Sequence, residues 1–101
     1  MPKYQSFATD TFKKIYNSLD KGEQDWIQKI KLSLQESITG DILRYSWFRE
    51  KKYQNKRLYF IVDENTKRIL LLSFASKKDQ QKIIDNIIED MKGLLEYLRG
   101  L

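Results

Sequence analysis

The chain has 101 residues, of which 41% are hydrophobic and 13% aromatic, and its formal net charge is +5. This length allows one domain, 1–101, and this composition excludes a disordered chain. The absence of cysteine and histidine excludes disulfides, thiolate or imidazole metal sites, and catalysis by either side chain. No apolar run approaches the roughly 20 residues that cross a bilayer, and the first residues lack an apolar segment of signal-peptide length. We therefore expect a cytoplasmic protein that does not bind a membrane.

The first part of the chain is expected to form one strand and two helices. Residues 4–8 are apolar enough for a short edge strand, and apolar residues recur at helical spacing over 10–19. Asp20 and Glu23 have the spacing of a capping box and open a second helix, which Gly40 is expected to end. The two helices are predicted to form an antiparallel hairpin with one apolar face.

The pattern then changes to three strands and a final helix. Apolar and polar residues alternate over 43–53, and the nearly continuous apolar runs at 57–62 and 69–75 are typical of strands covered on both faces. Short turns make these strands antiparallel neighbours. A long helix is expected over 76–98, weakened near its end by Gly93. The sequence therefore predicts an α+β fold, with the helix hairpin on one face of an antiparallel meander and the long C-terminal helix on the other face or at one end of it.

The positive charge is concentrated in the middle of the chain. Residues 44–82 carry eleven basic and four acidic side chains, whereas the flanking segments are neutral or negative. Antiparallel pairing is expected to bring the strand ends of this segment to one rim of the sheet. The cations expected on this rim are Arg49, Lys51, Lys52, Arg57, Lys77 and Lys78, and Lys56 is expected around the hairpin turn beside them. Such side chains, together with the N-terminus of the following helix, suit phosphate groups, so nucleic acid is the partner that the charge favours.

Several of these candidates have a purely structural explanation as well. The aromatic candidates for stacking on an unpaired base are Trp47, Tyr53 and Tyr59. Trp47 and Tyr59 equally fit ordinary packing within the sheet. Arg57 equally fits an ion pair with Glu50 or Asp79, and the lysines of the turn equally fit simple solvation.

Three short motifs and the order of the elements resemble a known family. Residues 56–64, Lys-Arg-Leu-Tyr-Phe-Ile-Val-Asp-Glu, are similar to a central strand in which an arginine precedes an apolar run and an acidic turn. Residues 47–52 resemble the basic strand of the same family, and residues 76–79 resemble its basic junction. The family is the RelE/ParE superfamily of toxins from type II toxin–antitoxin systems. The resemblance implies a RelE/ParE-like fold over nearly the whole chain.

The resemblance also implies a reaction and partners. RelE-type members cut messenger RNA at the ribosome without a metal or cofactor, because the ribose 2′-hydroxyl attacks the adjacent phosphate. By position, Arg57 would hold the phosphate, Lys51 or Lys52 would act as the base, and Lys78 would replace a second catalytic arginine. Arg49 would clamp the RNA backbone. The other implied phosphate or base contacts are Lys56, Lys77, Tyr53 and Tyr59. The implied partners are a cognate antitoxin, messenger RNA and the ribosome.

Two departures from the family pattern keep other functions open. Catalytic members often carry a tyrosine a few residues after the basic junction, and residues 80–84 contain none. Lys78 also lacks the bidentate fork of an arginine. A non-catalytic member of the fold, such as a ParE-like gyrase inhibitor or a decayed toxin, is one alternative, and a basic nucleic-acid-binding module is another. Core packing explains the apolar stripe of residues 84–98, whereas an exposed remainder would allow a homodimer.

Overall fold

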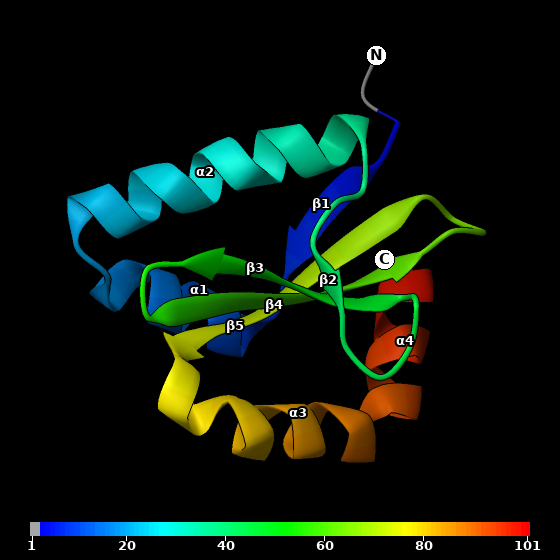
Figure 1. The fold of residues 1–101 in the computed structure, drawn as a ribbon. Helices are drawn as coiled ribbons and strands as arrows, with labels where there is room; N and C mark the ends of the chain where they lie inside the picture. Colours follow the sequence, from blue (N-terminus) through cyan, green and yellow to red (C-terminus); the bar gives the residue numbers. More distant parts are fainter. Residues whose placement is uncertain (1–2) are drawn as a thin grey trace.

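The structure, a computed structural model, describes residues 3–101 as a five-stranded sheet with helices on both faces (Figure 1). The strands are β1 (Gln5–Ala8), β2 (Asp41–Ile42), β3 (Phe48–Tyr53), β4 (Lys56–Asp63) and β5 (Arg68–Ser76). The helices are α1 (Asp10–Ser18), α2 (Lys21–Glu36), α3 (Gln80–Glu89) and α4 (Met91–Arg99), and a short 3₁₀ helix, η1 (Lys77–Asp79), precedes α3. The strand order is β1-β5-β4-β3-β2, with β1 parallel to β5 and all other pairs antiparallel.

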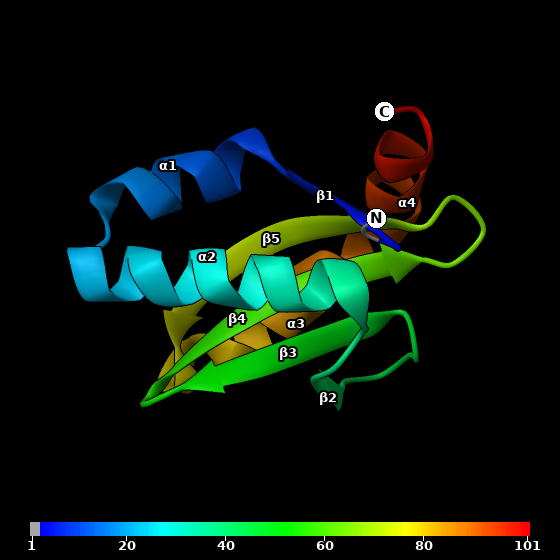
Figure 2. The ribbon, with the colours of Figure 1, turned by 90° about the horizontal axis from the view of Figure 1, so that it is seen from above.

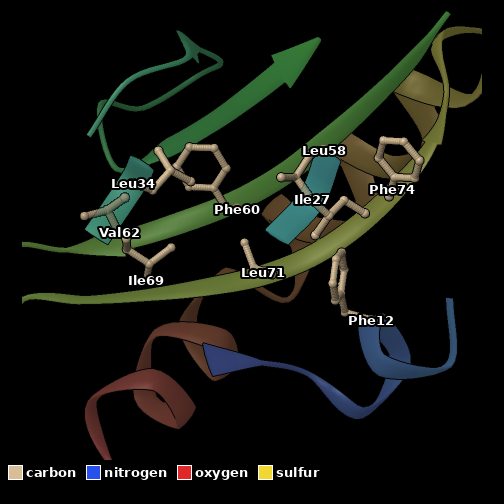
Figure 3. Close-up of a cluster of buried hydrophobic side chains, with 9 residues drawn as sticks. All are labelled: Phe12, Ile27, Leu34, Leu58, Phe60, Val62, Ile69, Leu71 and Phe74. Atoms are coloured by element: carbon tan, nitrogen blue, oxygen red, sulfur yellow. The ribbon is translucent and has the colours of Figure 1, made fainter. Parts of the chain in front are cut away.

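The α+β fold expected from the sequence is confirmed, including the meander β3-β4-β5 and the edge strand β1. The hairpin α1–α2 covers one face of the sheet, and α3 and α4 lie on the other (Figure 2). Two buried clusters result, one on each face. The cluster under the hairpin contains Phe12, Ile27, Leu34, Leu58, Phe60, Val62, Ile69, Leu71 and Phe74 (Figure 3). Alternate residues of β4 enter opposite clusters, which explains why its apolar run is continuous.

The helix starts follow the capping signals. The Thr9 hydroxyl accepts a hydrogen bond of 3.0 Å from the Phe12 amide at the start of α1. At the start of α2, the Asp20 side chain accepts a hydrogen bond from the Glu23 amide, and the Glu23 side chain accepts one from the Asp20 amide. This reciprocal capping box satisfies amides that a helix otherwise leaves unpaired. It also holds Glu23 in a buried position that faces β4.

Gly40 does not end α2, because the helix stops earlier, at Glu36. Gly40 has a φ of +109°, and a Cβ atom at this position would lie 2.7 Å from the Glu50 carbonyl oxygen. Glycine is therefore required here so that the chain can pass close to β3. Gly40 therefore marks the point at which the chain enters β2, and not the end of a helix.

The segment 43–53 does not form the single strand that was expected, because its first part is a loop and only its second part is β3. Residues 43–47 form a loop, closed by a 2.9 Å hydrogen bond from the Leu43 amide to the Phe48 carbonyl. The Phe48 amide in turn donates to the Tyr45 carbonyl at 3.0 Å. Alternation of apolar and polar residues continues through this loop, so periodicity alone could not separate it from β3.

The prediction of a single long helix over 76–98 is wrong. The chain forms η1, α3 and α4, with a break at Asp90, whose φ and ψ of −100° and 13° are not helical. A straight helix of that length would extend about 34 Å, as far as the longest dimension of the molecule, 33 Å. The break instead lets Ile87 of α3 and Leu98 of α4 enter the same buried cluster. No helix within residues 3–101 has the length and apolar character needed to span a membrane.

The β4–β5 turn holds the end of α4. The Arg68 guanidinium donates hydrogen bonds to the Leu98 and Arg99 carbonyls at 3.2 and 2.9 Å. The Arg99 Nε atom lies 3.5 Å from Asp63 Oδ2, which also accepts a 2.6 Å hydrogen bond from the Thr66 hydroxyl. Burial raises the pKa of the Asp63 carboxyl, but the Thr66 hydrogen bond and the Arg99 charge outweigh it, so this pKa lies below its ordinary value.

Asp63→Asn is expected to lower the free energy of unfolding by roughly 1 kcal/mol at pH 7, since it removes this ion pair. A carboxyl with a lowered folded-state pKa stabilises the fold above its unfolded pKa, and this stabilisation is lost as the pH falls through the lower folded value. The difference from the wild type should therefore shrink below about pH 4. Urea unfolding, followed by tryptophan fluorescence at pH 7 and pH 3, measures it, with the exposed Asp25→Asn as control. If the free energy of unfolding differs between Asp63→Asn and the wild type by the same amount at both pH values, the lowered pKa of Asp63 is contradicted.

Candidate active site

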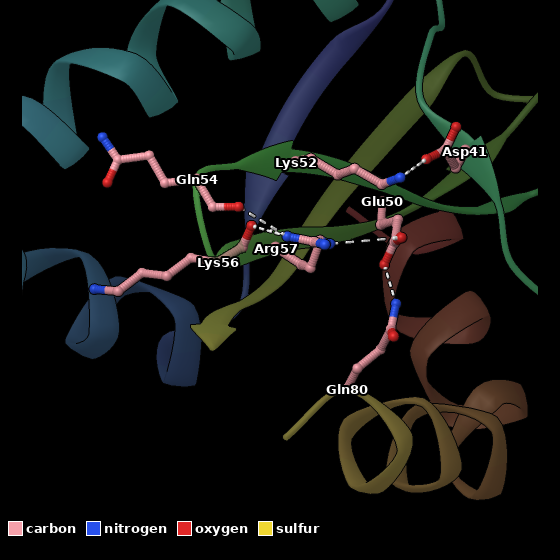
Figure 4. Close-up of polar contacts among 7 residues, drawn as sticks. All are labelled: Asp41, Glu50, Lys52, Gln54, Lys56, Arg57 and Gln80. Carbon is pink, nitrogen blue, oxygen red and sulfur yellow. Dashed lines mark hydrogen bonds and ion pairs between the residues drawn. The ribbon is translucent and has the colours of Figure 1, made fainter. Parts of the chain in front are cut away.

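A buried arginine–carboxylate pair lies between β3, β4 and the start of α3 (Figure 4). Arg57 is 7% exposed and Glu50 is 4% exposed, and Arg57 Nε lies 3.9 Å from Glu50 Oε1. The Gln80 amide donates a 2.7 Å hydrogen bond to Glu50 Oε2. Of the two ion pairs that the sequence allowed for Arg57, the one with Glu50 is confirmed. Glu50 is thus held from β4 by a cation and from α3 by an amide.

The strand register explains why these side chains meet. In β3 and β4, Lys52 lies opposite Arg57, and Glu50 lies opposite Tyr59. Residues opposite each other in a sheet point to the same face, and residues two apart in one strand do so too. Glu50, Lys52, Arg57 and Tyr59 therefore all lie on the face that α3 covers.

The Arg57 guanidinium also stabilises the turn between β3 and β4. Its Nη1 atom donates to the Gln54 and Lys56 carbonyls at 3.2 and 2.9 Å. Gln54 has a φ of +54°, a region that non-glycine residues adopt rarely. Arg57 Nε has no hydrogen-bond partner within residues 3–101 although it is fully buried. The carbonyl groups of the turn therefore fix the orientation of the Arg57 guanidinium, while its Nε–H group donates no hydrogen bond within the described residues.

Tyr59 lies beside this pair and has a second unpaired polar atom. Its hydroxyl is buried without a hydrogen-bond partner within the described residues. Burial, followed by the charge of Glu50, raises the pKa of Tyr59 to about 12. Tyr59 is fully buried in the cluster that contains Phe48, so it packs in the sheet and cannot stack on a nucleic-acid base.

Tyr59→Phe is expected to leave the free energy of unfolding unchanged or to raise it by up to about 1 kcal/mol, because a buried hydroxyl without a partner is costly. Tyr4→Phe is the matched control, since the Tyr4 hydroxyl donates to the Glu64 carboxylate at 2.9 Å and its loss should be mildly destabilising. Both variants can be compared by urea unfolding. A loss of more than 1 kcal/mol in Tyr59→Phe would contradict the unpaired state of this hydroxyl.

The expected cations do not all gather on one rim. Lys52 and Arg57 lie on the α3 face, whereas Arg49, Lys51 and Lys56 lie on the α2 face, because consecutive side chains of a strand alternate. The expectation of a single rim containing all of them is therefore wrong. The strand ends meet as expected, and the predicted alternation of Arg49 and Lys51 with Glu50 and Lys52 divides the cations at that end between two faces.

The three cations on the α2 face have local partners. Arg49 donates to the Ser46 and Gly40 carbonyls at 3.0 and 3.4 Å, near the end of β3 that is far from the turn. The Lys51 ammonium lies 3.1 Å from the Thr39 hydroxyl. Lys56 forms an ion pair with the buried Glu23 of α2. These contacts give all three residues a structural role beside α2.

The remaining expected cations, Lys52, Lys77 and Lys78, lie on the α3 face or at the junction that follows β5. The Lys77 amide donates a 2.7 Å hydrogen bond to the Asn55 carbonyl, so the junction after β5 lies against the β3–β4 turn, as expected. Lys77 and Lys78 are exposed. Lys52 is also exposed, and its ammonium lies 3.4 Å from Asp41 Oδ2. Exposed positive charge therefore lies at the same end of the β3–β4 hairpin as Arg57.

The remaining aromatic candidates pack on other side chains. The Tyr53 ring lies 4.8 Å from that of Trp26 and 6.2 Å from that of Phe74, under the helix hairpin. Trp47 is half-buried and stacks on Tyr45 in the β2–β3 loop, with 4.9 Å between ring centroids. Tyr53 therefore lies on the face away from the Arg57–Glu50 pair, and Trp47 packs against the cluster that contains Tyr59.

Sequence reasoning treated Glu50 only as a counter-charge and did not consider Gln80. The signal that could have found Glu50 is its position two residues before Lys52, which places both on the face of Arg57. Gln80 becomes relevant only because η1 directs the start of α3 toward β3. Together these groups offer a guanidinium for a phosphate oxygen and a fixed carboxylate that can accept a proton.

The architecture that surrounds this site is the fold of the RelE toxins. A mutant of the E. coli toxin RelE in the free state superposes with a TM-score of 0.69 at 17% identity, over 80% of this chain and 90% of that chain. The same mutant toxin in complex with a RelBc antitoxin peptide gives 0.68 at 12% identity, over 80% and 94%. The intact E. coli RelBE toxin–antitoxin complex gives 0.65 at 14% identity, over 72% and 95%. No protein family and no curated protein matches the sequence.

Proposed function

We propose that this chain is a single-domain toxin of a type II toxin–antitoxin system that cleaves messenger RNA at the ribosome. The RelE fold supports the class of protein. The observation that carries the enzymatic part is the pairing of a partly unsatisfied buried arginine with a carboxylate that α3 holds in place. Buried polar groups without partners are rare, and a catalytic role is one explanation for such a group.

The arrangement suits a transesterification of RNA. Glu50 accepts the proton of a ribose 2′-hydroxyl, and the oxygen forms a bond to the adjacent phosphorus. The bond from phosphorus to the 5′-oxygen then breaks, which leaves a 2′,3′-cyclic phosphate and, once the leaving oxygen takes a proton from water, a 5′-hydroxyl, while Glu50 returns its proton to the solvent. The Arg57 guanidinium stabilises the additional negative charge on the phosphate oxygens during this step.

The surface lysines have supporting roles in this proposal. Lys52 and Lys78 provide positive charge beside the leaving oxygen, and Lys77 holds a neighbouring phosphate. The first turn of α3 adds its partial positive charge at the same place. Lys51 is not the base in this scheme, since it lies on the α2 face.

One observation favours a non-catalytic protein of the same fold instead. Arg57 uses one nitrogen on two carbonyl groups of the β3–β4 turn, which is a sufficient structural reason for the residue. The segment 80–84 also contains no tyrosine to complete the family pattern. In this second candidate function, the chain acts on another target, such as gyrase, or only binds its partners.

A cognate antitoxin is the partner that the proposal requires. Several solved structures with this fold are complexes of a RelE toxin with a RelB antitoxin. The lysines around the Arg57–Glu50 pair are exposed and favour an acidic segment of such a partner. Covering Lys52, Lys77 and Lys78 would at the same time block access of RNA to the pair.

The proposal can be tested by induced expression in a bacterial host. The wild type should arrest growth and create new 5′ ends within translated messages, whereas Arg57→Lys should do neither at equal protein level. The Arg99→Lys variant should behave as the wild type, because Arg99 lies in α4 and pairs with Asp63 at the opposite end of β4 from Arg57. Arrest without new 5′ ends would favour a ParE-like target, and the absence of arrest by a folded, soluble product would contradict an active toxin.

A further inference from the structure

The loop between β2 and β3 carries a stack of aromatic rings that leads from the core to the surface. The Tyr45 and Trp47 rings are nearly parallel, with 4.9 Å between their centroids and 7° between their planes. Trp47 also lies 6.2 Å from Phe48, at 19°, and Phe48 is fully buried. Tyr45 is 39% exposed, and within residues 3–101 no other ring and no cation lies over it. The stack therefore ends at the surface with one aromatic ring.

Hydrogen bonds fix the backbone that presents these rings. Two of them close the loop itself, as described above. In addition, the Val62 amide donates a 2.8 Å hydrogen bond to the Trp47 carbonyl, and the Arg49 guanidinium donates one of 3.0 Å to the Ser46 carbonyl, between the two rings. None of these bonds uses the Tyr45 side chain. The ring pair is therefore preorganised, so little conformational entropy is lost when a ligand binds to it.

We propose that the outer face of Tyr45 is a stacking platform for an unpaired base of RNA, with Arg44 on a phosphate of the same nucleotide. This inference rests on the proposed function in one respect, since it takes RNA as the partner. A base has a flat aromatic face that an exposed tyrosine or tryptophan can receive, whatever the sequence of the strand.

The platform is separate from the Arg57–Glu50 pair. The loop lies at the opposite end of β3 from the β3–β4 turn (Figure 2). Phe48 and Lys52 are four residues apart in β3, which corresponds to about 13 Å, and Lys52 lies opposite Arg57. The platform therefore receives a base other than the two joined by the phosphate that Arg57 would bind. This base belongs either to a more distant part of the message or to ribosomal RNA.

The charge of the loop favours a nucleotide over an apolar peptide or a second copy of this chain. Residues 42–49 contain two arginines and no acidic side chain. Arg44 is exposed and takes part in no ion pair within residues 3–101. Glu64, whose carboxylate feels the Arg49 charge, already accepts a hydrogen bond from Lys67. Two such loops facing each other would bring like charges together, whereas a nucleotide supplies both a ring and a negative charge.

Binding can be separated from cleavage with fluorescein-labelled, single-stranded RNA dodecamers that are 2′-O-methylated. Tyr45→Ser should weaken binding about tenfold, because it removes the ring on which the base stacks. Tyr45→Phe keeps the ring and should bind within twofold of the wild type. The matched control, Tyr97→Ser on α4, removes a tyrosine that is 48% exposed and should also stay within twofold. The melting temperature checks that each variant is folded.

The phosphate contact has a separate readout. Arg44→Ala should reduce the slope of log affinity against log salt by about 0.7, which is the loss of one phosphate contact on a single strand. Lys29→Ala, at an exposed position of α2, should leave this slope unchanged. An unchanged slope in Arg44→Ala would refute the role of Arg44.

Photocrosslinking on ribosomes identifies the source of the base. The full chain with p-azidophenylalanine in place of Tyr45 is added to ribosomes that carry a defined message and is then irradiated. We expect crosslinks to unpaired nucleotides, and sequencing of the crosslinked strand distinguishes the message from ribosomal RNA. The same replacement of Tyr97 should crosslink to neither.

The outcomes separate this inference from the proposed function. If the wild type cleaves RNA but position 45 gives no RNA crosslink and Tyr45→Ser binds as Tyr97→Ser does, the platform is refuted and the function stands. If the wild type cleaves no RNA but the affinities and crosslinks are as described, the platform stands and the enzymatic proposal fails. Crosslinks from position 45 to protein alone, or a dimer that Tyr45→Ser dissociates, would assign the platform to a protein partner and overturn the inference.

Discussion

Glu50→Gln is expected to lower the rate of RNA cleavage by about 10²–10⁴-fold, because the amide cannot accept the proton of the 2′-hydroxyl. The substitution keeps the size of the side chain, and its remaining carbonyl oxygen can still accept the hydrogen bond from Gln80. The loss should therefore appear in the rate of the chemical step and not in the affinity for RNA. Single-turnover cleavage of a message on stalled ribosomes measures the rate directly.

Two further variants test whether the loss of cleavage comes from removal of the Glu50 carboxylate itself. Glu50→Asp retains the charge but withdraws it from Arg57, so a partial loss of rate is expected. Glu36→Gln, at the exposed end of α2, should cleave as the wild type does. Circular dichroism and the melting temperature check that each variant is folded. A folded Glu50→Gln protein with an unchanged rate would rule out Glu50 as the base.

Arg57→Lys is expected to reduce cleavage by about 10²–10³-fold, which is the usual cost of removing one preorganised donor from a developing negative charge. Lysine retains the positive charge beside Glu50 but cannot provide the planar fork of donors that a phosphate receives from arginine. The readout is the same single-turnover rate, with binding of the 2′-O-methylated RNA measured separately.

The alanine variant at this position would confuse function with stability. Arg57→Ala leaves Glu50 buried without its cation and also removes hydrogen bonds from the β3–β4 turn, so a loss of about 3–5 kcal/mol is expected. Arg57→Lys avoids most of this loss and is the informative change. If Arg57→Lys is folded and cleaves at the wild-type rate, Arg57 has only a structural role.

Much of the scaffold around these residues could be predicted from the sequence. The capping box at Asp20 and Glu23 and the continuous apolar run of β4 each have one simple physical explanation, and both are confirmed. The break at Asp90 could not be predicted, because nothing local requires it. The expected weak point was Gly93, whereas the break at Asp90 lets Ile87 of α3 and Leu98 of α4 enter the same buried cluster.

The site was harder to predict than the scaffold, because its composition depends on which face of the sheet each side chain occupies. A shift of one residue moves every side chain of a strand to the other face. Alternation correctly separates Arg49 and Lys51 from Glu50 and Lys52, but it does not say which face carries the buried Arg57–Glu50 pair and Gln80. That choice is made by η1 and α3, which bring Gln80 to Glu50 and leave the lysines exposed.

The most direct test is the chemistry of the RNA ends that the purified protein produces on ribosomes carrying a defined message, with EDTA present throughout. We expect cuts within the message that carry a 2′,3′-cyclic phosphate on one fragment and a 5′-hydroxyl on the other, and we expect their loss in Glu50→Gln. Fragments with 5′-phosphates, or an intact message after incubation with the folded wild-type protein, would contradict the proposed transesterification.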